Sequence, residues 1–401
     1  MRIGRTLPPA ASPIGWTNFV FGLLGLTKGP AARDGFAADL ALHYNQRHCF
    51  LVSSGKAALT LILKALHQRY PDRDEVLIPA YTCYSVPSAI ARAGLKVRLC
   101  DIGENSLDYD LSLLAQLLDN KKLLCVIPTH LFGLPADIAA LRSLITDPEV
   151  TIVEDAAQAM GGEVHGQQLG TLGDVGFFSL GRGKALSTVE GGVILTNDDE
   201  LAALIRSEYE TLPEYQLTEQ VKLILYAIAL NLLMHPWLFW VPKSLPFLKL
   251  GETIYDTGFS SKKLTAFQAG LGRHWRNTLA KSKQIRSTHV GDWQSIITGS
   301  FTATTDGKPQ PLIRFPLIMG SPKQAESILC QSEDAGLGIA ISYPDAIHHI
   351  PQIADQFAGQ DYPNAAAIVQ RLVTLPVHRY VTEKDILNIS AMMKDKIHGQ
   401  R

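Results

Sequence analysis

Short apolar runs alternate with helical stretches from about residue 50 onward, and this alternation constrains the fold more than any other feature. We predict strands at residues 75–78, 96–100, 123–128 and 150–153, and helices at 57–67 and 136–144. Strands that alternate with helices form a largely parallel sheet covered on both faces. Ligands bind such α/β folds at the carboxyl ends of the strands. The residues directly after each apolar run are therefore where we look for chemistry.

A change of pattern in the last third of the chain predicts a second domain. The chain has 401 residues, whereas a domain usually has about 100–200. A helix predicted at 274–286 is followed by strands such as 312–318 and by a final helix at 382–393. We therefore predict an N-terminal arm over residues 1–30, a large domain over 31–280 and a smaller α+β domain over 281–401.

Charge and cysteine content exclude several classes of function. There are 37 Lys and Arg against 38 Asp and Glu, which leaves a net charge of −1, and nucleic-acid binding usually needs a basic surface. The five cysteines are scattered and form no C-x-x-C pair. Neither a metal site nor a disulfide framework is expected, and a cytoplasmic location fits reduced thiols. Prolines interrupt the N-terminus before the short apolar stretch at 19–26, so we expect no signal peptide.

The turn that opens the helix at 57–67 is a candidate anion site. Ser53, Ser54, Gly55 and Lys56 bring hydroxyls, a residue without a side chain and a cation to a helix N-terminus, where exposed amides bind anions. Ser and Gly are also ordinary residues at such a position. From these residues alone, either an anion site or a simple helix cap remains open.

Two further residues carry chemistry beside predicted strands. Asp155 comes just after the strand at 150–153, where its carboxylate could hold a cationic ring nitrogen or cap the next helix. Lys184 lies in a Gly-, Ser- and Thr-rich loop within residues 173–192. A desolvated lysine can form a Schiff base, although most lysines are solvated on the surface. An anion site, a ring-nitrogen partner and such an amine together make the set that pyridoxal phosphate needs.

Several motifs give the chain a resemblance to the DegT family of sugar aminotransferases, which are pyridoxal-phosphate enzymes of fold type I. The resemblance runs from about residue 53 to 386. It is carried by S-G at 54–55, I-P-A-Y-T at 78–82, H-L-F-G-L-P-A-D at 130–137, E-D-A-A-Q-A at 154–159, V-E-G-G at 189–192, Y-P-N-A at 362–365 and L-P-V-H at 375–378. It implies an α/β large domain with a mostly parallel central sheet flanked by helices, and a smaller C-terminal domain.

The resemblance also implies roles for individual residues. Lys184 corresponds to the lysine that binds the cofactor and moves the proton, and Asp155 to the carboxylate on the pyridine nitrogen. Gln158 corresponds to a contact with the phenolic edge of the ring. The implied phosphate ligands are Ser54, Gly55, Lys56 and Ser179. His130 and Glu190 match motif positions without an assigned role.

At three places near the implied cofactor the chain departs from the family. Lys56 stands where the family has a phosphate-binding Thr. Cys83 stands where an aromatic residue covers the cofactor ring, so we expect Tyr84, or else Tyr81, to supply the ring. Ser261 replaces an Asn that reaches the partner subunit's phosphate, and Lys263 aligns with a family Arg next to it. A homodimer with shared active sites is implied, and Ser261 is our candidate for this contact.

Amino transfer is the activity that the resemblance implies. Family members that carry out dehydration have His in place of Lys184, which this chain keeps. The implied donor is glutamate, and the acceptor is a keto-sugar, commonly nucleotide-linked, used for amino sugars or surface polysaccharides. A lipid-linked or non-sugar carbonyl as acceptor, and a cofactor-binding scaffold without turnover, are alternatives. Tyr343, His348 and His349 are candidates on the substrate side.

An apolar insertion at about 215–255 lengthens the chain beyond the family's usual spacing. Its segment 223–240 contains no Asp, Glu, Lys or Arg over 18 residues. We expect helices that are buried against the same domain or a dimer partner. The alternatives are peripheral membrane contact through residues 221–250, with Trp237 and Trp240 at headgroup level, and a full membrane span.

Overall fold

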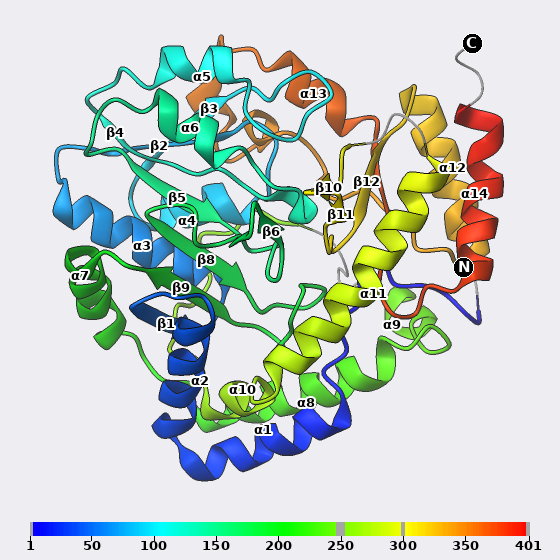
Figure 1. Ribbon diagram of the computed structural model, residues 1–401, viewed down its shortest axis with the longest axis horizontal. Coiled ribbons are helices and arrows are strands. Elements are labelled where there is room, and N and C mark those ends of the chain that lie inside the picture. Colours follow the sequence, from blue (N-terminus) through cyan, green and yellow to red (C-terminus); the bar gives the residue numbers. More distant parts are fainter. Residues whose placement is uncertain (1–2, 246–252, 298–300, 398–401) are drawn as a thin grey trace.

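The computed structural model describes residues 3–245, 253–297 and 301–397. A seven-stranded sheet runs through it in the order β1-β9-β8-β5-β4-β2-β3 (Figure 1). Its neighbours pair in parallel except at β9, which runs antiparallel to both β1 and β8. The strands are β1 (His48–Val52), β2 (Glu75–Pro79), β3 (Lys96–Cys100), β4 (Leu123–Val126), β5 (Thr151–Asp155), β8 (Val175–Ser179) and β9 (Gly192–Thr196). The predicted α/β fold with a mostly parallel sheet is confirmed.

Helices cover both faces of this sheet because its strands are apolar on both sides. Phe50 and Val52 of β1 pack in a core with α3, while Leu51 between them packs in a second core with α2, as expected from the two-residue period of a strand. The helices of this part are α1 (Trp16–Lys28), α2 (Pro30–His43), α3 (Gly55–Arg69), α4 (Ser85–Arg92), α5 (Leu111–Leu117), α6 (Ile138–Leu144), α7 (Asp199–Glu210), α8 (Leu217–Leu233), α9 (Trp240–Lys243) and α10 (Ala266–Leu271).

A separate core forms where β12 (Phe315–Ile318) pairs with β13 (Leu372–Leu375) between helices of the C-terminal part. The helices of this part are α11 (Trp275–Ile296), α12 (Pro322–Ala335), α13 (Pro363–Val369) and α14 (Glu383–Ile397). Short antiparallel pairs are formed by β6 (Glu163–Val164) with β7 (Gln167–Gln168), between β5 and β8 in the chain, and by β10 (Thr304–Thr305) with β11 (Lys308–Pro309). The helix predicted at 274–286 continues to Ile296, so the predicted boundary at residue 280 falls inside α11. Residues Tyr343 to Ile368 contribute side chains to the core of the main sheet. The division into domains stays a prediction.

In its described part, the apolar insertion forms two helices, α8 and α9. After Leu233 the chain leaves α8, and Pro236 lies in the break before α9. A proline cannot supply the amide hydrogen that a continuing helix needs. Within the described residues, no helix is both long and apolar enough to cross a membrane.

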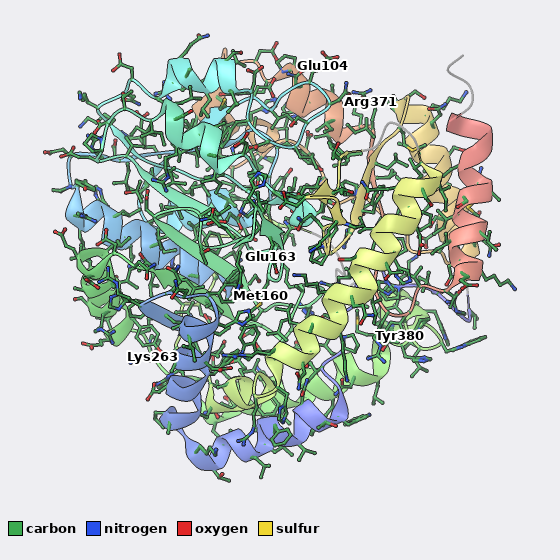
Figure 2. The ribbon with its side chains drawn as sticks, viewed as in Figure 1. Glu104, Met160, Glu163, Lys263, Arg371 and Tyr380 are labelled. Atoms are coloured by element: carbon green, nitrogen blue, oxygen red, sulfur yellow. The ribbon has the colours of Figure 1, made fainter. Side chains whose placement is uncertain are left out.

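An N-terminal segment, residues 5–11, ties distant parts of the chain together. The Thr6 amide donates to the Pro236 carbonyl at 2.8 Å and the Leu7 amide to the Gly336 carbonyl at 2.9 Å. Arg5 makes a bidentate ion pair with Asp385 at 2.6 and 2.7 Å. The Arg5 guanidinium also donates to the carbonyl of Tyr380, which Figure 2 shows beside this junction. The segment therefore bridges the insertion, α12 and the start of α14.

Candidate active site

The carboxyl end of β5 is held in place by a buried ionic cluster. Glu154 accepts hydrogen bonds from the amides of Gly170, Leu172 and Gly173 at 2.5, 2.6 and 2.8 Å, and its carboxylate lies 2.7 Å from His130 Nε2. Burial alone raises the pKa of a carboxyl, but the hydrogen bonds from His130 and the amides hold the pKa of Glu154 below its usual value. The Ala136 amide donates to His130 Nδ1, so His130 donates from Nε2.

Asp155, the next residue, faces the other side of the strand end. It is 4% exposed, and its carboxylate accepts from the Ala157 amide at 3.0 Å. Burial raises the pKa of Asp155, while the Ala157 amide, Lys184 and His130 oppose this shift. A buried carboxylate at the carboxyl end of a central strand can act as a partner for a cationic group.

Lys184 lies opposite, in the loop between β8 and β9. Burial lowers the pKa of its amine, Arg314 lowers it further, and the nearby Cys83 and Asp155 oppose this. The loop bends sharply at Gly183, where φ is +73°, a conformation that suits glycine. The Arg286 guanidinium donates to the Lys184 carbonyl at 3.1 Å. The lowered pKa favours the neutral amine, in contrast to a fully solvated surface lysine.

The turn before α3 meets the end of β8, and we call these two adjoining segments, around Gly55 and Ser179, the cup. A Cβ added to Gly55 would lie 3.1 Å from the Cβ of Ser179, so the two residues are in direct contact. The Ser54 hydroxyl accepts from the Ala57 amide as the helix cap, and the amides of the first turn have no partner within the helix. The cap and the anion site are thus compatible. This donor set of amides and hydroxyls fits a phosphate.

Aromatic side chains line the region next to Gln158. The Gln158 side chain accepts from the Phe132 amide at 3.2 Å and donates to the Tyr343 hydroxyl at 2.9 Å. The Tyr343 ring stacks on Phe132 and meets Tyr81 edge-on, with ring centroids 6.4 and 5.6 Å apart. The structure therefore brings Tyr343 and Tyr81 together on one side of the site.

Lys56 and Tyr84 are engaged with other groups. The Lys56 ammonium lies 3.3 Å from a carboxylate oxygen of Asp256 and over the ring of Phe259. The Tyr84 hydroxyl donates to the Asp345 carbonyl at 3.1 Å, and burial raises the pKa of Tyr84 to about 12. Cys83, in contrast, lies within electrostatic reach of Lys184. The roles of Lys56 and Tyr84 as cofactor ligands stay predictions.

The segment that carries Ser261 lies beside the cup in the same chain. The Ser53 amide donates to the Lys262 carbonyl at 2.9 Å, and the Ser53 hydroxyl donates to the Ser260 carbonyl. Lys263 lies near β1 and α7 in Figure 2, with its ammonium over the Tyr209 ring. A contact from Ser261 to a partner subunit stays a prediction.

Glu190, His348 and His349 each contact a neighbouring side chain. Glu190 accepts a hydrogen bond from the Tyr215 hydroxyl, and the preceding Val189 has a φ of +77°, which is strained for a β-branched residue. His349 pairs with Asp345 at 2.8 Å, and the His348 ring lies at a tilt against Tyr362, with ring centroids 5.0 Å apart. The substrate-side role of both histidines stays a prediction.

Sequence reasoning missed two arginines. Arg314 lies near Lys184, Tyr81 and Tyr343, and burial lowers its pKa. Arg286 is 2% exposed, burial lowers its pKa to about 10, and its Nη1 has no hydrogen-bond partner among the described residues. Neither arginine belongs to a quoted motif, so only the folded chain reveals these cations at the site.

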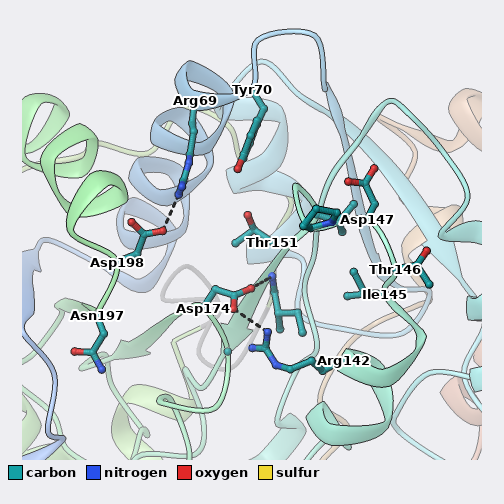
Figure 3. A pocket seen from close by; sticks show the side chains of 14 residues that line it. Arg69, Tyr70, Arg142, Ile145, Thr146, Asp147, Thr151, Asp174, Asn197 and Asp198 are labelled. Carbon is teal, nitrogen blue, oxygen red and sulfur yellow. Dashed lines mark hydrogen bonds and ion pairs between the residues drawn. The ribbon is translucent and has the colours of Figure 1, made fainter.

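A cavity of about 570 Å³ lies at the opposite, amino-terminal edge of the parallel strands (Figure 3). Its charged groups pair with each other: Arg69 with Asp198 at 2.6 Å, and Arg142 with Asp174 at 2.9 Å. Thr151, which lines this cavity, begins β5, whereas Asp155 ends the same strand. This cavity is separate from the site around Lys184.

Known proteins resemble this chain in sequence and in fold. The chain is 26% identical over 386 residues to the spore coat polysaccharide biosynthesis protein SpsC of Bacillus subtilis, across 93% of this chain and 91% of that protein. It is 32% identical over 166 residues to GDP-perosamine synthase of Vibrio cholerae, across 41% and 44% of the two chains. The structure matches the sugar aminotransferase CalS13 from Micromonospora echinospora with a TM-score of 0.77 at 20% identity, across 97% and 99% of the two chains. This match confirms the predicted fold type I architecture. Residues 25–394 match the model of the DegT/DnrJ/EryC1/StrS aminotransferase family, and the chain therefore belongs to this family of pyridoxal-phosphate-dependent aminotransferases.

Proposed function

We propose that this protein transfers an amino group from an amino acid, with glutamate as the donor, to a nucleotide-linked keto-sugar in amino-sugar or surface-polysaccharide biosynthesis. The observation that carries the proposal is the placement of Lys184 near Asp155 and beside the cup at Gly55 and Ser179, where burial lowers the pKa of the lysine amine. The names of SpsC and GDP-perosamine synthase support the sugar acceptor.

The residues present fit pyridoxal phosphate. The amides and hydroxyls at Ser54, Gly55 and Ser179 would bind its phosphate, and the Asp155 carboxylate would keep its ring nitrogen protonated. When bound, the cofactor supplies an electron-withdrawing ring that stabilises negative charge on the substrate carbon. Gln158 would orient the ring edge from its position between Phe132 and Tyr343.

Lys184 is the group that moves the proton. Its amine is neutral more readily than a solvated lysine because burial lowers its pKa, and a neutral Nζ can accept a proton from the α-carbon of the donor. The same atom then returns a proton when the acceptor is aminated. Family members that dehydrate their substrate have His here, and the Lys favours amino transfer.

A homodimer and a cytoplasmic location complete the proposal. Ser261 would approach the phosphate of the partner subunit, where a family Asn does so. The segment that carries Ser261 is fixed by its backbone bonds to Ser53, which would hold this residue in position for the contact.

The test is an absorbance titration of the purified protein with pyridoxal phosphate and then with glutamate. We expect a cofactor band that glutamate converts to the pyridoxamine form, with release of a keto acid. Lys184→Ala should abolish the lysine-bound band, whereas Lys121→Ala, at a lysine side chain that is 88% exposed, should retain it. Incubation of the loaded enzyme with nucleotide-linked keto-sugars, followed by mass spectrometry, identifies the acceptor.

Two outcomes would contradict the proposal. A band that no amino donor alters would favour a cofactor-binding scaffold without turnover. Amination of only non-sugar carbonyls would retain the chemistry and refute the sugar acceptor.

A further inference from the structure

Exposed apolar side chains gather on one face of the molecule. More than half of the large apolar residues that are exposed in the described ranges lie on α1, on α8 and in the turn after α8. Monomeric soluble proteins rarely present a large continuous apolar patch. We call this the α1–α8 face and define it by Trp16, Val20, Leu24, Leu225, Leu232 and Trp237, which are 53, 53, 50, 59, 45 and 61% exposed.

The two helices lie side by side at the edge of the fold and are firmly packed on their inner sides (Figure 1). The Gly15 amide at the start of α1 donates to the Asn231 side chain of α8 at 2.7 Å. Leu223 and Ala227 of α8 are buried in a core with Phe267. The outer apolar side chains are therefore presented by helices that are held in place.

Close backbone contact fixes α1 in particular. A Cβ added to Gly25 would lie 2.3 Å from the Ala266 carbonyl oxygen, and one added to Gly270 would lie 2.3 Å from the Phe21 carbonyl oxygen. Only glycine permits α1 and α10 to approach so closely. Because α1 is fixed in this way, it cannot roll to bury Val20 or Leu24, and no described segment of the chain covers its apolar outer side.

Cations lie at the end of the face where α1 finishes. No acidic residue occurs in α1, and Glu219 of α8 is paired with Lys262 at 2.6 Å. Lys28 and Arg273 line a hollow of about 380 Å³ between α1, α2 and α10. The carboxylate of Asp39, which also lines this hollow, pairs with Arg276 at 2.6 Å. The charge at the rim is complementary to anions.

We propose that the α1–α8 face lies on the surface of a bilayer that contains anionic lipid. The aliphatic side chains enter the boundary between headgroups and acyl chains, and Trp16 and Trp237 lie at headgroup level. Lys28 and Arg273 bind the lipid phosphates. The contact is with one leaflet, because no described helix can cross a membrane. The apolar centre of the face, its two tryptophans and the cations at its edge together favour lipid, and not a second copy of the chain, as the occupant of the face.

Co-sedimentation of the holoenzyme with vesicles tests the proposal. We expect binding to phosphatidylglycerol–phosphatidylcholine vesicles at least about tenfold stronger than to phosphatidylcholine alone, since each cation near an anionic surface adds to affinity. Leu225→Glu and Val20→Glu should each weaken binding about tenfold or more. The matched control is Leu387→Glu on α14, where the side chain is 69% exposed, and it should bind like the wild type.

Folding of each variant is checked by its cofactor absorbance and by circular dichroism. Lys28→Glu should remove most of the preference for anionic vesicles. A wild type that does not sediment, or a Leu387→Glu variant that weakens binding equally, would overturn the proposal. So would Glu variants that change the oligomer measured by light scattering but leave vesicle binding intact, because the occupant would then be a second copy.

Discussion

Replacing Glu154 by Gln changes charge but not shape at the most heavily hydrogen-bonded carboxylate near the site. Oε1 of Glu154 accepts from His130 and Gly170, and Oε2 accepts from Leu172 and Gly173. In Glu154→Gln, one terminal atom becomes an amide nitrogen. In either orientation of this amide, its NH2 group faces two buried hydrogen-bond donors that bonded to a carboxylate oxygen in the wild type.

The magnitude follows from these contacts. A hydrogen bond to a charged group contributes about 1.5–3 kcal/mol, so losing two predicts a decrease of about 3–6 kcal/mol in the free energy of unfolding. That is a large share of the roughly 5–15 kcal/mol of a typical protein. Because Asp155 directly follows Glu154, the affinity for pyridoxal phosphate should also fall.

Urea unfolding of the wild type and variant, followed by circular dichroism, measures this difference. The control is Glu163→Gln, at a half-exposed carboxylate that pairs with Lys283 and is labelled in Figure 2. A surface pair of this kind contributes about 0–1 kcal/mol. If Glu154→Gln cost no more than Glu163→Gln, the assignment of Glu154 as the anchor of the β5 end would be wrong.

Three further predictions concern the cup and the N-terminal segment. Gly55→Val should reduce cofactor affinity at least about tenfold, because its side chain would occupy the space beside Ser179; equilibrium dialysis measures this, and unchanged affinity would refute the cup. Burial lowers the pKa of His378 to about 4, so its neutral form stabilises the fold above pH 6.5, and this contribution is lost as the pH falls toward 4. The free energy of unfolding of His378→Gln should therefore depend less on pH over this window than that of the wild type. An equal pH dependence of the two proteins would contradict the reasoning. Arg5→Ala, which leaves the buried Asp385 carboxylate without its bidentate partner, should lower the thermal midpoint through a loss of about 1–3 kcal/mol; an unchanged midpoint in calorimetry would show that the segment is not anchored there.

The sequence allowed good prediction where local pattern and chemistry coincide. The strand at 150–153 and the carboxylate after it were predictable because apolar alternation and position at a strand end are local properties. Ser179 at the end of β8 and Lys184 in the loop after it are likewise only five positions apart in the chain. The structure extends the predicted helix at 57–67 to Gly55 because Ser54 caps it, a detail of one turn.

What could not be predicted depends on residues far apart in the chain. The ion pair of Lys56 joins residues separated by 200 positions, and no local pattern indicates Asp256 as its partner. Arg286 and Arg314 reach the site through the path of α11 and β12, and a single arginine carries no recognisable motif. The insertion has apolar residues on all sides, so its composition alone could not separate a membrane span from two packed helices.

The ion pair of Arg5 has a consequence for how the protein is made. Its partner Asp385 lies 380 positions later, so this contact can form only after the residues between them have been made. At about 5–20 residues per second, that interval lasts roughly 20–75 s. During this interval the partners of the neighbouring Thr6 and Leu7 are made before the ionic partner of Arg5, and a bulky group fused ahead of Arg5 would delay or block the pairing with Asp385.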